Sequence, residues 1–166
     1  GGLHEGGHRV PLVIAWAAGG VPRDADCADL VGLTDLYATL LDLVGAPPPV
    51  AGHAADSVSF KRRLLVPSVG HPVRTELLVP NNLAWAFRHL HWKLIGRAIA
   101  GRHQAEQLFD LAVDPSEAHD LLNASRPVLS ANRLLSARLL ARVRSVGAPV
   151  APRRPPLWST RGRAVS

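Results

Sequence analysis

Residues 10–17 read VPLVIAWA, an unbroken and partly β-branched apolar run with glycines on both sides. Such a run is typical of a strand that is buried on both faces, as in a parallel sheet covered by helices on each side. Gly19-Gly20 follow and mark the end of the element. The run therefore predicts a buried strand over Val10–Ala17 and places the chain in the α/β class.

A helix is expected next, over residues 34–44. Thr34 can cap its first turn, and Gly45 with the prolines that follow it stops the helix. One face carries its larger apolar residues, which are Leu36, Leu40, Leu43 and Val44. A strand followed by a helix is half of an α/β repeat, and nothing upstream in the sequence completes the sheet.

Short strands and one long helix are expected in the second half of the chain. The predicted strands are Glu76–Pro80, the hairpin partners Leu83–Arg88 and Trp92–Arg97, and Glu106–Leu111. The helix is expected over Pro127–Val146, with Ser125 as its cap. Its apolar residues, Val146 included, lie on one face of the helix, and arginines flank that face on both sides. This pattern predicts a small antiparallel sheet packed with a C-terminal helix.

These elements divide the chain into four parts. Residues 1–50 are interpreted as the incomplete end of an α/β domain, and residues 51–75 as a linker rich in proline, glycine and alanine. Residues 76–146 form the predicted C-terminal α+β subdomain. Residues 147–166 are rich in proline, arginine and serine, which predicts a disordered basic tail.

The positive charge of the chain is concentrated at its C-terminal end. The 166 residues carry a formal net charge of +6, and nine arginines but no acidic residue follow Asp120. A basic helix and tail are compatible with a module that binds nucleic acid or an anionic membrane surface. The helix arginines, however, occupy both edges of the apolar arc, as expected for a helix whose arginine stems pack beside a sheet. A nucleic-acid partner is therefore not favoured.

Cysteine, methionine and hydropathy exclude further classes. The single cysteine, Cys27, cannot form an internal disulfide or build a structural zinc site. No apolar run approaches the ~20 residues of a membrane helix, so no transmembrane segment is predicted. The chain contains no methionine, and we therefore expect it to be a fragment or a processed piece of a longer protein.

The most distinctive stretch is GGLHEGGHRVP, residues 1–11. Glycines allow close approach of the backbone to a ligand or another segment, and loops at strand ends border the ligand crevice of open α/β sheets. The glycines alone favour a tight turn without further role, and the alternative is a buried ion pair of Glu5 with Arg9 that fixes the loop before the strand. Because the glycines make a helix improbable, His4 and His8 are interpreted as surface or pocket-edge residues instead of metal ligands. His4, Glu5, His8 and Arg9 are thus the candidate pocket-edge residues.

Asp114-Pro115-Ser116-Glu117 has a structural interpretation of its own. Asp114 is expected to cap a short helix with Pro115 at its first position. Glu117 would then reach back to the amide of the cap.

Six segments together resemble the sulfatase family and follow its order over residues 1–125. Glu5-Gly6-Gly7 with Arg9-Val10-Pro11 resembles a segment late in the catalytic domain, and residues 34–45 resemble a family helix, with Ala38 where proline is usual. The remaining matches are Asp56–Phe60, Ala86-Phe87-Arg88 with Trp92–Ile95, Gln107–Leu111, and Asp114-Pro115 with Glu117. The bacterial arylsulfatase A-like group is the most similar branch.

The resemblance implies an alkaline-phosphatase-like fold and hydrolysis of sulfate esters, with a sulfated small molecule or sulfated glycan as substrate. It also implies a formylglycine nucleophile made from cysteine in a Cys-x-Pro/Ser-x-Arg motif, and a calcium ion that binds the sulfate. Cys27 lacks the following arginine of that motif, and the metal-binding carboxylates belong to segments before Gly1. The late catalytic lysine of the family would fall one residue before Gly1. We therefore predict no catalytic residue and no metal ligand in this chain, and no activity without the N-terminal catalytic portion.

Other interpretations stay open at this stage. A non-catalytic remnant of a sulfatase gene is compatible with Ala38, and a basic anion-binding module is compatible with the C-terminal arginines. A related phosphate or phosphonate ester hydrolase would share the same motifs. Localisation is not determined by these residues, although many sulfatases are exported to the periplasm or the medium.

Overall fold

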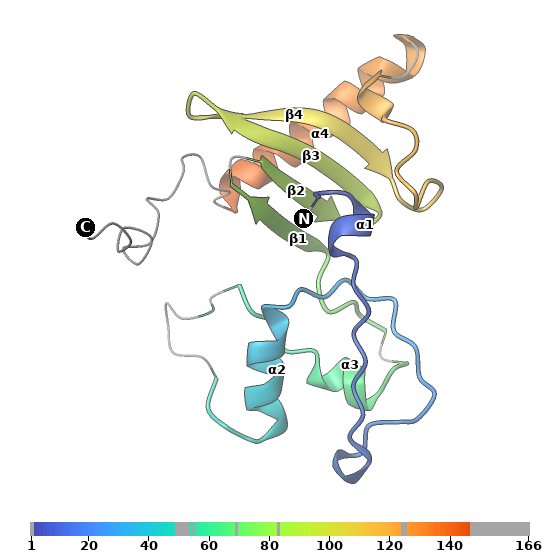
Figure 1. Cartoon of the computed structure of the whole chain (residues 1–166), viewed down its shortest axis with the longest axis vertical. Coiled ribbons are helices and arrows are strands. Elements are labelled where there is room, and N and C mark those ends of the chain that lie inside the picture. The colour runs from blue at the N-terminus through green and yellow to red at the C-terminus, as the bar shows by residue number, and fades with distance from the viewer. Residues whose placement is uncertain are drawn as a thin grey trace, which may run out of the picture.

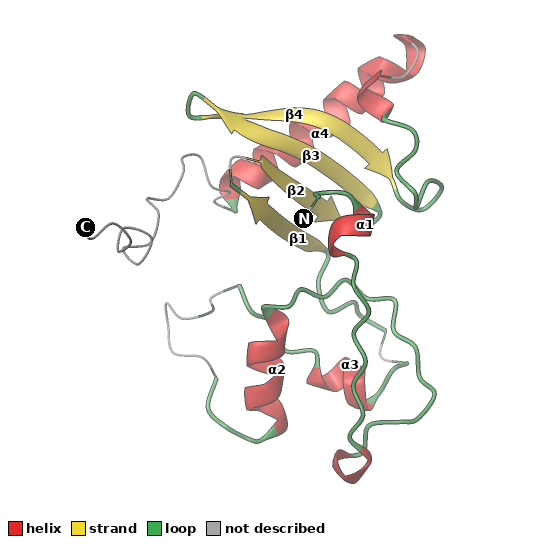
Figure 2. Cartoon of the chain, viewed as in Figure 1, coloured by secondary structure: helices red, strands yellow, loops and turns green. Residues whose placement is uncertain are grey.

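The computed structural model describes residues 2–48, 54, 56–68, 70–82, 84–123 and 126–146. Four strands form an antiparallel sheet in chain order: β1 (Glu76–Asn81), β2 (Ala84–His89), β3 (Trp92–Ile99) and β4 (Arg102–Asp110). Figure 2 shows the four strands as one twisted layer. The predicted antiparallel sheet is confirmed. β4 begins earlier than the sequence predicted, because its exposed polar start gives little apolar alternation.

The central hairpin forms as predicted, but its turn is one residue shorter than the predicted strand ends allow, because His89 still pairs with Trp92. Arg88 lies opposite Lys93 and His89 opposite Trp92, so Leu90 and His91 form a two-residue turn. Leu90 has a φ of 54°, the left-handed value that turns joining two strands so tightly require. This register decides which side chains of β2 and β3 face the same side of the sheet.

Helix α4 (Arg126–Ser145) covers one face of the sheet and lies behind it in Figure 1. Leu139 and Val143 pack there on a core of large residues from three strands, which are Trp85, Phe87, Leu94 and Leu108. The helix is confirmed, although Ser125 lies outside the described residues. Val146 was expected in the buried arc but is 41% exposed. That expectation was wrong because Val146 follows the last helical residue and lies beyond the contact with the sheet.

The opposite face of the sheet has a smaller core. Ala86, Ile95 and Phe109 are buried there, and Leu3 from the N-terminal segment packs on them. The short helix α1 (Glu5–His8) follows Leu3 and lies in front of the sheet in Figure 1. The N-terminal segment therefore covers the face of the sheet that α4 leaves open.

Helices α2 (Asp35–Leu43) and α3 (Lys61–Leu65), with the segments that join them, form a second half below the sheet (Figure 1). The α2 helix is confirmed, but its predicted cap is wrong. Thr34 makes no side-chain cap bond, whereas the Asp35 carboxylate accepts hydrogen bonds from the amides of Gly32 (2.7 Å) and Val58 (2.8 Å). The carboxylate of Asp35 is fully buried and also pairs with Arg74. This contact ties α2 to the segment that leads into β1.

The predicted strand over Val10–Ala17 does not form. Residues 10–16 run without regular structure into a short 3-10 turn, η1 (Ala17–Gly19), and Val13 is 88% exposed. A strand needs a partner for its backbone hydrogen bonds, and no other strand of the described residues lies beside this segment. The apolar pattern of a segment is therefore not sufficient to predict a strand.

The predicted short helix at Asp114 is also absent. The Asp114 carboxylate instead accepts hydrogen bonds from the amides of Ala118 (3.1 Å) and His119 (2.8 Å) in an open loop. Glu117 has a φ of 57°, and its carboxylate accepts a hydrogen bond from the amide of Glu5 instead of the predicted one from the cap. A second 3-10 turn, η2 (Leu121–Asn123), follows. No helix in the described part of the chain is long and apolar enough to cross a membrane.

Candidate functional site: the Glu5 clamp

The residues singled out in the N-terminal stretch lie on a single helical turn. The amide of Gly7 donates to the carbonyl of His4, and that of Arg9 donates to the carbonyl of Glu5, both at 2.8 Å. A helix was considered improbable here, so this expectation was wrong. The turn requires glycine at position 7, because a Cβ on Gly7 would collide with the backbone of Gly2.

The side chain of Glu5 lies against the sheet, next to two cations. Its Oε1 is 2.9 Å from Nζ of Lys93 on β3, and its Oε2 is 3.3 Å from a guanidinium nitrogen of Arg88 on β2. Arg88 and Lys93 are cross-strand partners in the hairpin, so the register presents both cations together. The alternative pair of Glu5 with Arg9 does not form. Arg9 is exposed, because the turn directs it away from the sheet.

A second carboxylate completes this group. Oε1 of Glu117 lies 2.7 Å from Nζ of Lys93, and its Oε2 accepts a hydrogen bond from the amide of Glu5 at 2.5 Å. Oε2 of Glu117 is also 3.3 Å from Nδ1 of His4. We call Glu5, Arg88, Lys93 and Glu117 the Glu5 clamp, since they fasten the N-terminal turn to the sheet and to the loop after β4.

Two members of the clamp are buried, the other two are half-buried, and their formal charges are balanced. The side chain of Lys93 is 0% exposed and that of Glu117 is 2% exposed. Burial tends to raise the pKa of Glu5, but the hydrogen bond and charge of Lys93, with the charges of Arg88 and His8, outweigh it and lower this pKa. Two anions and two cations neutralise one another. The clamp therefore has the properties of a structural ion network.

The two histidines lie outside the clamp proper. The ring of His4 packs edge-on against Phe109, with the centroids 5.6 Å apart, and Nε2 of His8 is 2.6 Å from the carbonyl oxygen of Leu3. These contacts direct the two rings to different partners. The structure thus brings His4 and Glu5 together through Glu117 and leaves Arg9 apart from them, and their predicted place at a pocket edge stays a prediction.

The described residues do not fit the cofactors that the sulfatase resemblance implies. No three His, Cys, Asp or Glu side chains among them gather into a group that could hold a metal ion. Cys27 is exposed and lies outside any Cys-x-Pro/Ser-x-Arg motif. Neither a calcium ion nor a formylglycine can therefore be assigned to this part of the chain.

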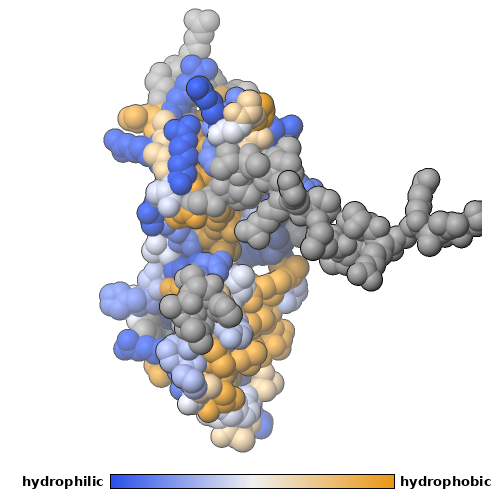
Figure 3. Space-filling model, turned by 90° about the vertical axis from the view of Figure 1, so that its left-hand side faces the viewer, coloured by the Kyte–Doolittle hydropathy of each residue, from blue (hydrophilic) through white to orange (hydrophobic). Residues whose placement is uncertain are grey.

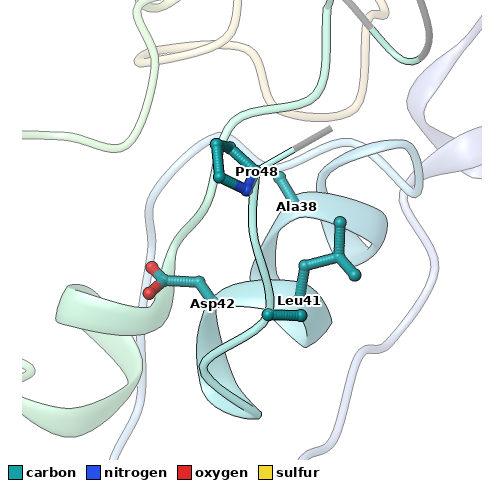
Figure 4. A pocket seen from close by; sticks show the side chains of 5 residues that line it. Ala38, Leu41, Asp42 and Pro48 are labelled. Carbon is teal, nitrogen blue, oxygen red and sulfur yellow. The ribbon is translucent and has the colours of Figure 1, made fainter. Parts of the chain in front are cut away.

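A small hollow of about 150 Å³ lies beside α2 and is lined by Ala38, Leu41, Asp42, Ala46 and Pro48. Figure 4 shows Asp42 pointing away from the other labelled side chains toward α3. Its carboxylate accepts a hydrogen bond from Ser59 at 2.7 Å and pairs with Lys61 at 3.2 Å. Its one acidic side chain is thus already bound, and no other lining residue has a polar side chain, so the hollow is not a candidate active site.

Comparison with known proteins supplies the family. Arylsulfatase K of Homo sapiens is 30% identical to this chain over 123 residues, which cover 69% of the chain and 22% of that protein. Arylsulfatase K of Bos taurus is 29% identical over 123 residues, with the same coverage. About two thirds of the chain is a sulfatase C-terminal region. The resemblance predicted from the motifs is confirmed.

A solved structure supports the same family. A Bacteroides thetaiotaomicron protein, described as a 6S-sulf in work on the metabolism of multiple glycosaminoglycans, is 26% identical with a TM-score of 0.50. The match covers 68% of the chain and 24% of that structure. No family model matches the chain. Sulfatases are alkaline-phosphatase-like hydrolases of sulfate esters, and the chain spans about a fifth of the length of the curated relatives it matches.

Sequence reasoning missed three members of the clamp. Lys93 and Arg88 stood in a motif of the sulfatase resemblance without a partner, and Glu117 was assigned to the amide of its own loop instead of the amide of Glu5. One signal was available for Lys93, which lies between Trp92 and the apolar pair Leu94-Ile95. A charged residue that must face a packed surface requires a partner of opposite charge. Sequence reasoning could thus have predicted an acidic partner for Lys93, although it could not have identified Glu5 or Glu117.

Proposed function

We propose that this chain is the C-terminal part of an enzyme that hydrolyses sulfate esters and that the chain by itself has no turnover. The observation that carries the proposal is the buried contact between Glu5 and Lys93. It joins the Glu-Gly-Gly stretch to the Trp-Lys hairpin, two motifs that the chain shares with sulfatases. The shared motifs thus meet at one place in the fold.

The clamp acts in this proposal as an anchor for a catalytic segment. Family resemblance places a catalytic lysine one residue before Gly1, and therefore near the anchored turn. Glu5 fixes this turn on the sheet through Lys93 and Arg88, while Glu117 holds its backbone amide. Lys93 and Glu117 are positioning residues in this scheme. Neither touches substrate, because both are enclosed by protein.

The nucleophile and the calcium site belong, in this proposal, to the N-terminal catalytic portion of the same protein. The substrate is a sulfated small molecule or a sulfated glycan. A glycan is supported by the Bacteroides relative, which is described in connection with glycosaminoglycans. Arg9 is exposed, follows the anchored turn directly and offers a cation to the sulfate group. His4 and His8 border the same turn.

The alternatives differ in their support. A basic module for nucleic acid needs free arginines, yet Nε of Arg142 on α4 lies 2.8 Å from Oε2 of Glu76 on β1. A folded non-catalytic remnant would keep the same structural ion network, so activity assays have to separate it from an enzyme. Phosphate and phosphonate esters remain alternative substrates, because the residues that select them lie in the N-terminal portion.

A pair of proteins tests the proposal. The chain of residues 1–166 and the same chain preceded by its upstream coding sequence are assayed with 4-nitrophenyl sulfate, with and without calcium, and with 4-nitrophenyl phosphate for comparison. We expect calcium-dependent sulfate release from the longer protein alone. Metal-dependent turnover by residues 1–166 alone contradicts the predicted inactivity. A folded longer protein that cleaves neither ester favours the remnant.

The role of Arg9 is tested in the longer protein. Arg9→Ala is expected to raise KM for the sulfate ester and to leave the urea unfolding midpoint unchanged, because the side chain is exposed. Arg102→Ala, at another exposed arginine, is the matched control and should change neither quantity. Equal KM values for the two variants would remove Arg9 from the pocket edge.

A further inference from the structure

The outward side of helix α4 carries three arginines that have no acidic partner. Arg133, Arg138 and Arg144 are exposed. Within the described part of the chain, none of their guanidinium groups donates a hydrogen bond or belongs to an ion pair. Arg142 on the same helix shows the contrast, because its Nε lies 2.8 Å from Oε2 of Glu76. Three cations of α4 are therefore available to a partner outside the described residues.

These three arginines lie on the same side of the helix. The opposite side is turned inward, and its buried side chains are Asn132, Ser136, Leu139 and Val143. With 3.6 residues per turn, Arg133, Arg138 and Arg144 fall within an arc of about 140° that faces away from the buried side. The rise of the helix separates neighbouring arginines by about 7 Å and about 9 Å along the axis. They form a row and not a single cluster.

No acidic residue balances this row. None follows Asp120 in the sequence, so α4 contains no carboxylate. Ala137 and Ala141 lie between the arginines, are exposed, and are too small to cover the guanidinium groups. We call the three arginines together with these two alanines the cationic face of α4. Figure 3 shows strongly hydrophilic residues, drawn dark blue, projecting from the upper half of the molecule, which holds the sheet and α4 (Figure 1).

We infer that the cationic face of α4 is an exosite, a surface apart from the catalytic site, that binds a linear sulfated glycan. Each guanidinium can donate two parallel hydrogen bonds to the oxygens of a sulfate group or a carboxylate. A row of three such groups is complementary to a chain that repeats its anions along one direction, whereas a single sulfate ester contacts only one of them. The inference deepens the proposed function and rests on it, because it narrows the substrate to a sulfated polymer.

The position of the cationic face in the fold also favours a polymer. α4 packs on one side of the sheet, and the N-terminal segment with α1 packs on the other (Figure 1). In the proposed enzyme the catalytic lysine lies near α1, so the sheet separates it from the cationic face. Only a long ligand contacts both. Binding at the face then keeps other sulfate groups of the same polymer near the catalytic site at a raised effective concentration.

Other polyanions fit the cationic face less well. Helices that bind an anionic membrane also insert several large apolar side chains. The apolar side of α4 is buried in the core, however, and Leu134, 57% exposed, is the large apolar residue left among the outward arginines. Single-stranded nucleic acid is held by aromatic side chains that stack on its bases, and α4 contains no aromatic residue. A sulfated glycan requires neither apolar insertion nor stacking.

Binding to heparin, a highly sulfated linear glycan, tests the inference. The protein extended by its upstream coding sequence is prepared as the triple variant Arg133→Gln, Arg138→Gln, Arg144→Gln. The matched control changes the net charge equally at three other exposed arginines, as Arg23→Gln, Arg62→Gln and Arg102→Gln. Because three exposed ion pairs are lost, we expect the dissociation constant at about 0.15 M salt to rise about tenfold in the helix variant. The control should change it by less than about twofold, and only the helix variant should weaken the salt dependence of binding.

The outcomes separate the cationic face from net charge and from other ligands. Equal weakening in the two variants overturns the inference, because the overall charge and not the face would then bind heparin. Equally tight binding of a DNA duplex or of phosphatidylserine vesicles, with the same loss in the helix variant, overturns the assignment to a sulfated glycan. Hydrolysis of 4-nitrophenyl sulfate by the unmodified longer protein is measured in parallel. If that protein does not cleave the ester but the helix variant alone loses heparin binding, the proposed activity is refuted and the cationic face is supported.

Discussion

Nζ of Lys93 lies 2.7 Å from Oε1 of Glu117, and neither side chain has more than 2% of its surface exposed. One residue comes from the middle of the sheet and the other from the loop after β4. Burial removes the water that would solvate both charges, so each depends on the other and on Glu5. The anchoring of the N-terminal turn therefore depends on one lysine between two carboxylates.

Lys93→Met should destabilise the chain strongly. It removes the cation while Glu5 and Glu117 remain, so two carboxylates face one another with less compensation. We expect a loss of about 3–5 kcal/mol in the free energy of unfolding, measured by urea denaturation.

Lys61→Met is the control for that experiment. Lys61 pairs with Asp42 at the surface, at 3.2 Å, where water screens the charges. Its replacement should have a much smaller effect. If the two variants lose equal stability, the clamp does not have the structural role given to it. Replacing Lys93 and Glu117 together with apolar residues should restore part of the loss.

Glu5 makes the clamp sensitive to acid. Its pKa is lowered because Lys93 and Arg88 outweigh the effect of burial, so folding favours the ionised carboxylate. The stabilisation is complete above the unfolded pKa of about 4.3 and is lost as the pH falls through the lower folded value. Glu5→Gln should reduce the difference in unfolding free energy between pH 6 and pH 3. An unchanged difference would show that Glu5 is not ionised in the clamp.

The strands and the long helix were predictable because their signals are local. The hairpin of β2 and β3 was recognised from two alternating segments with a short turn between them. Its register was not, because the predicted strand ends leave residues 89–91 for the turn, whereas the observed turn is one residue shorter and pairs Arg88 with Lys93. The leucine and valine spacing of α4 is equally local. Such elements need only the residues within them to be recognised.

The clamp and the segment at residues 10–17 were not predictable in the same way. Glu5, Lys93 and Glu117 come from three separate parts of the chain, and their contact depends on the face of the sheet that each reaches. Arg9 was the nearest cation in sequence, and it is exposed. Val10–Ala17 has the pattern of a strand, but pairing requires a neighbouring strand, and the described part of the chain places none beside it. The sequence pattern of a segment shows which secondary structure it favours, but whether a strand forms depends on the segments with which it can pair.

His103 gives the core a second pH dependence. Its side chain lies under α4, edge-on to the ring of Trp85 at a centroid distance of 5.8 Å. Burial, and then the charge of Arg144, lower its pKa, so the folded state favours the neutral ring. Stability from this group is complete above the unfolded pKa of about 6.5 and declines as the pH falls below it.

The expected result is a smaller pH dependence in His103→Gln. Its change in unfolding free energy between pH 7 and pH 5 should be less than that of the unmodified chain. Arg144→Gln removes one cause of the lowered pKa of His103. It should therefore reduce part of the change in unfolding free energy between pH 7 and pH 5. A steeper dependence in His103→Gln would contradict the assignment.

Gly96 is required by close packing in the middle of the sheet. It lies at the irregularity between β3 and β4, where a Cβ would collide with the carbonyl oxygen of Gln104 and the indole ring of Trp85. Both neighbours are constrained, since one is backbone of a paired strand and the other is the 0% exposed centre of the core. Gly96→Ala should therefore cost about 1–3 kcal/mol of unfolding free energy through overpacking. Gly70→Ala is the matched control, because nothing lies within 4 Å of its added Cβ. Urea denaturation of the two variants decides the matter, and equal midpoints would mean that β3 and β4 separate at this position without cost.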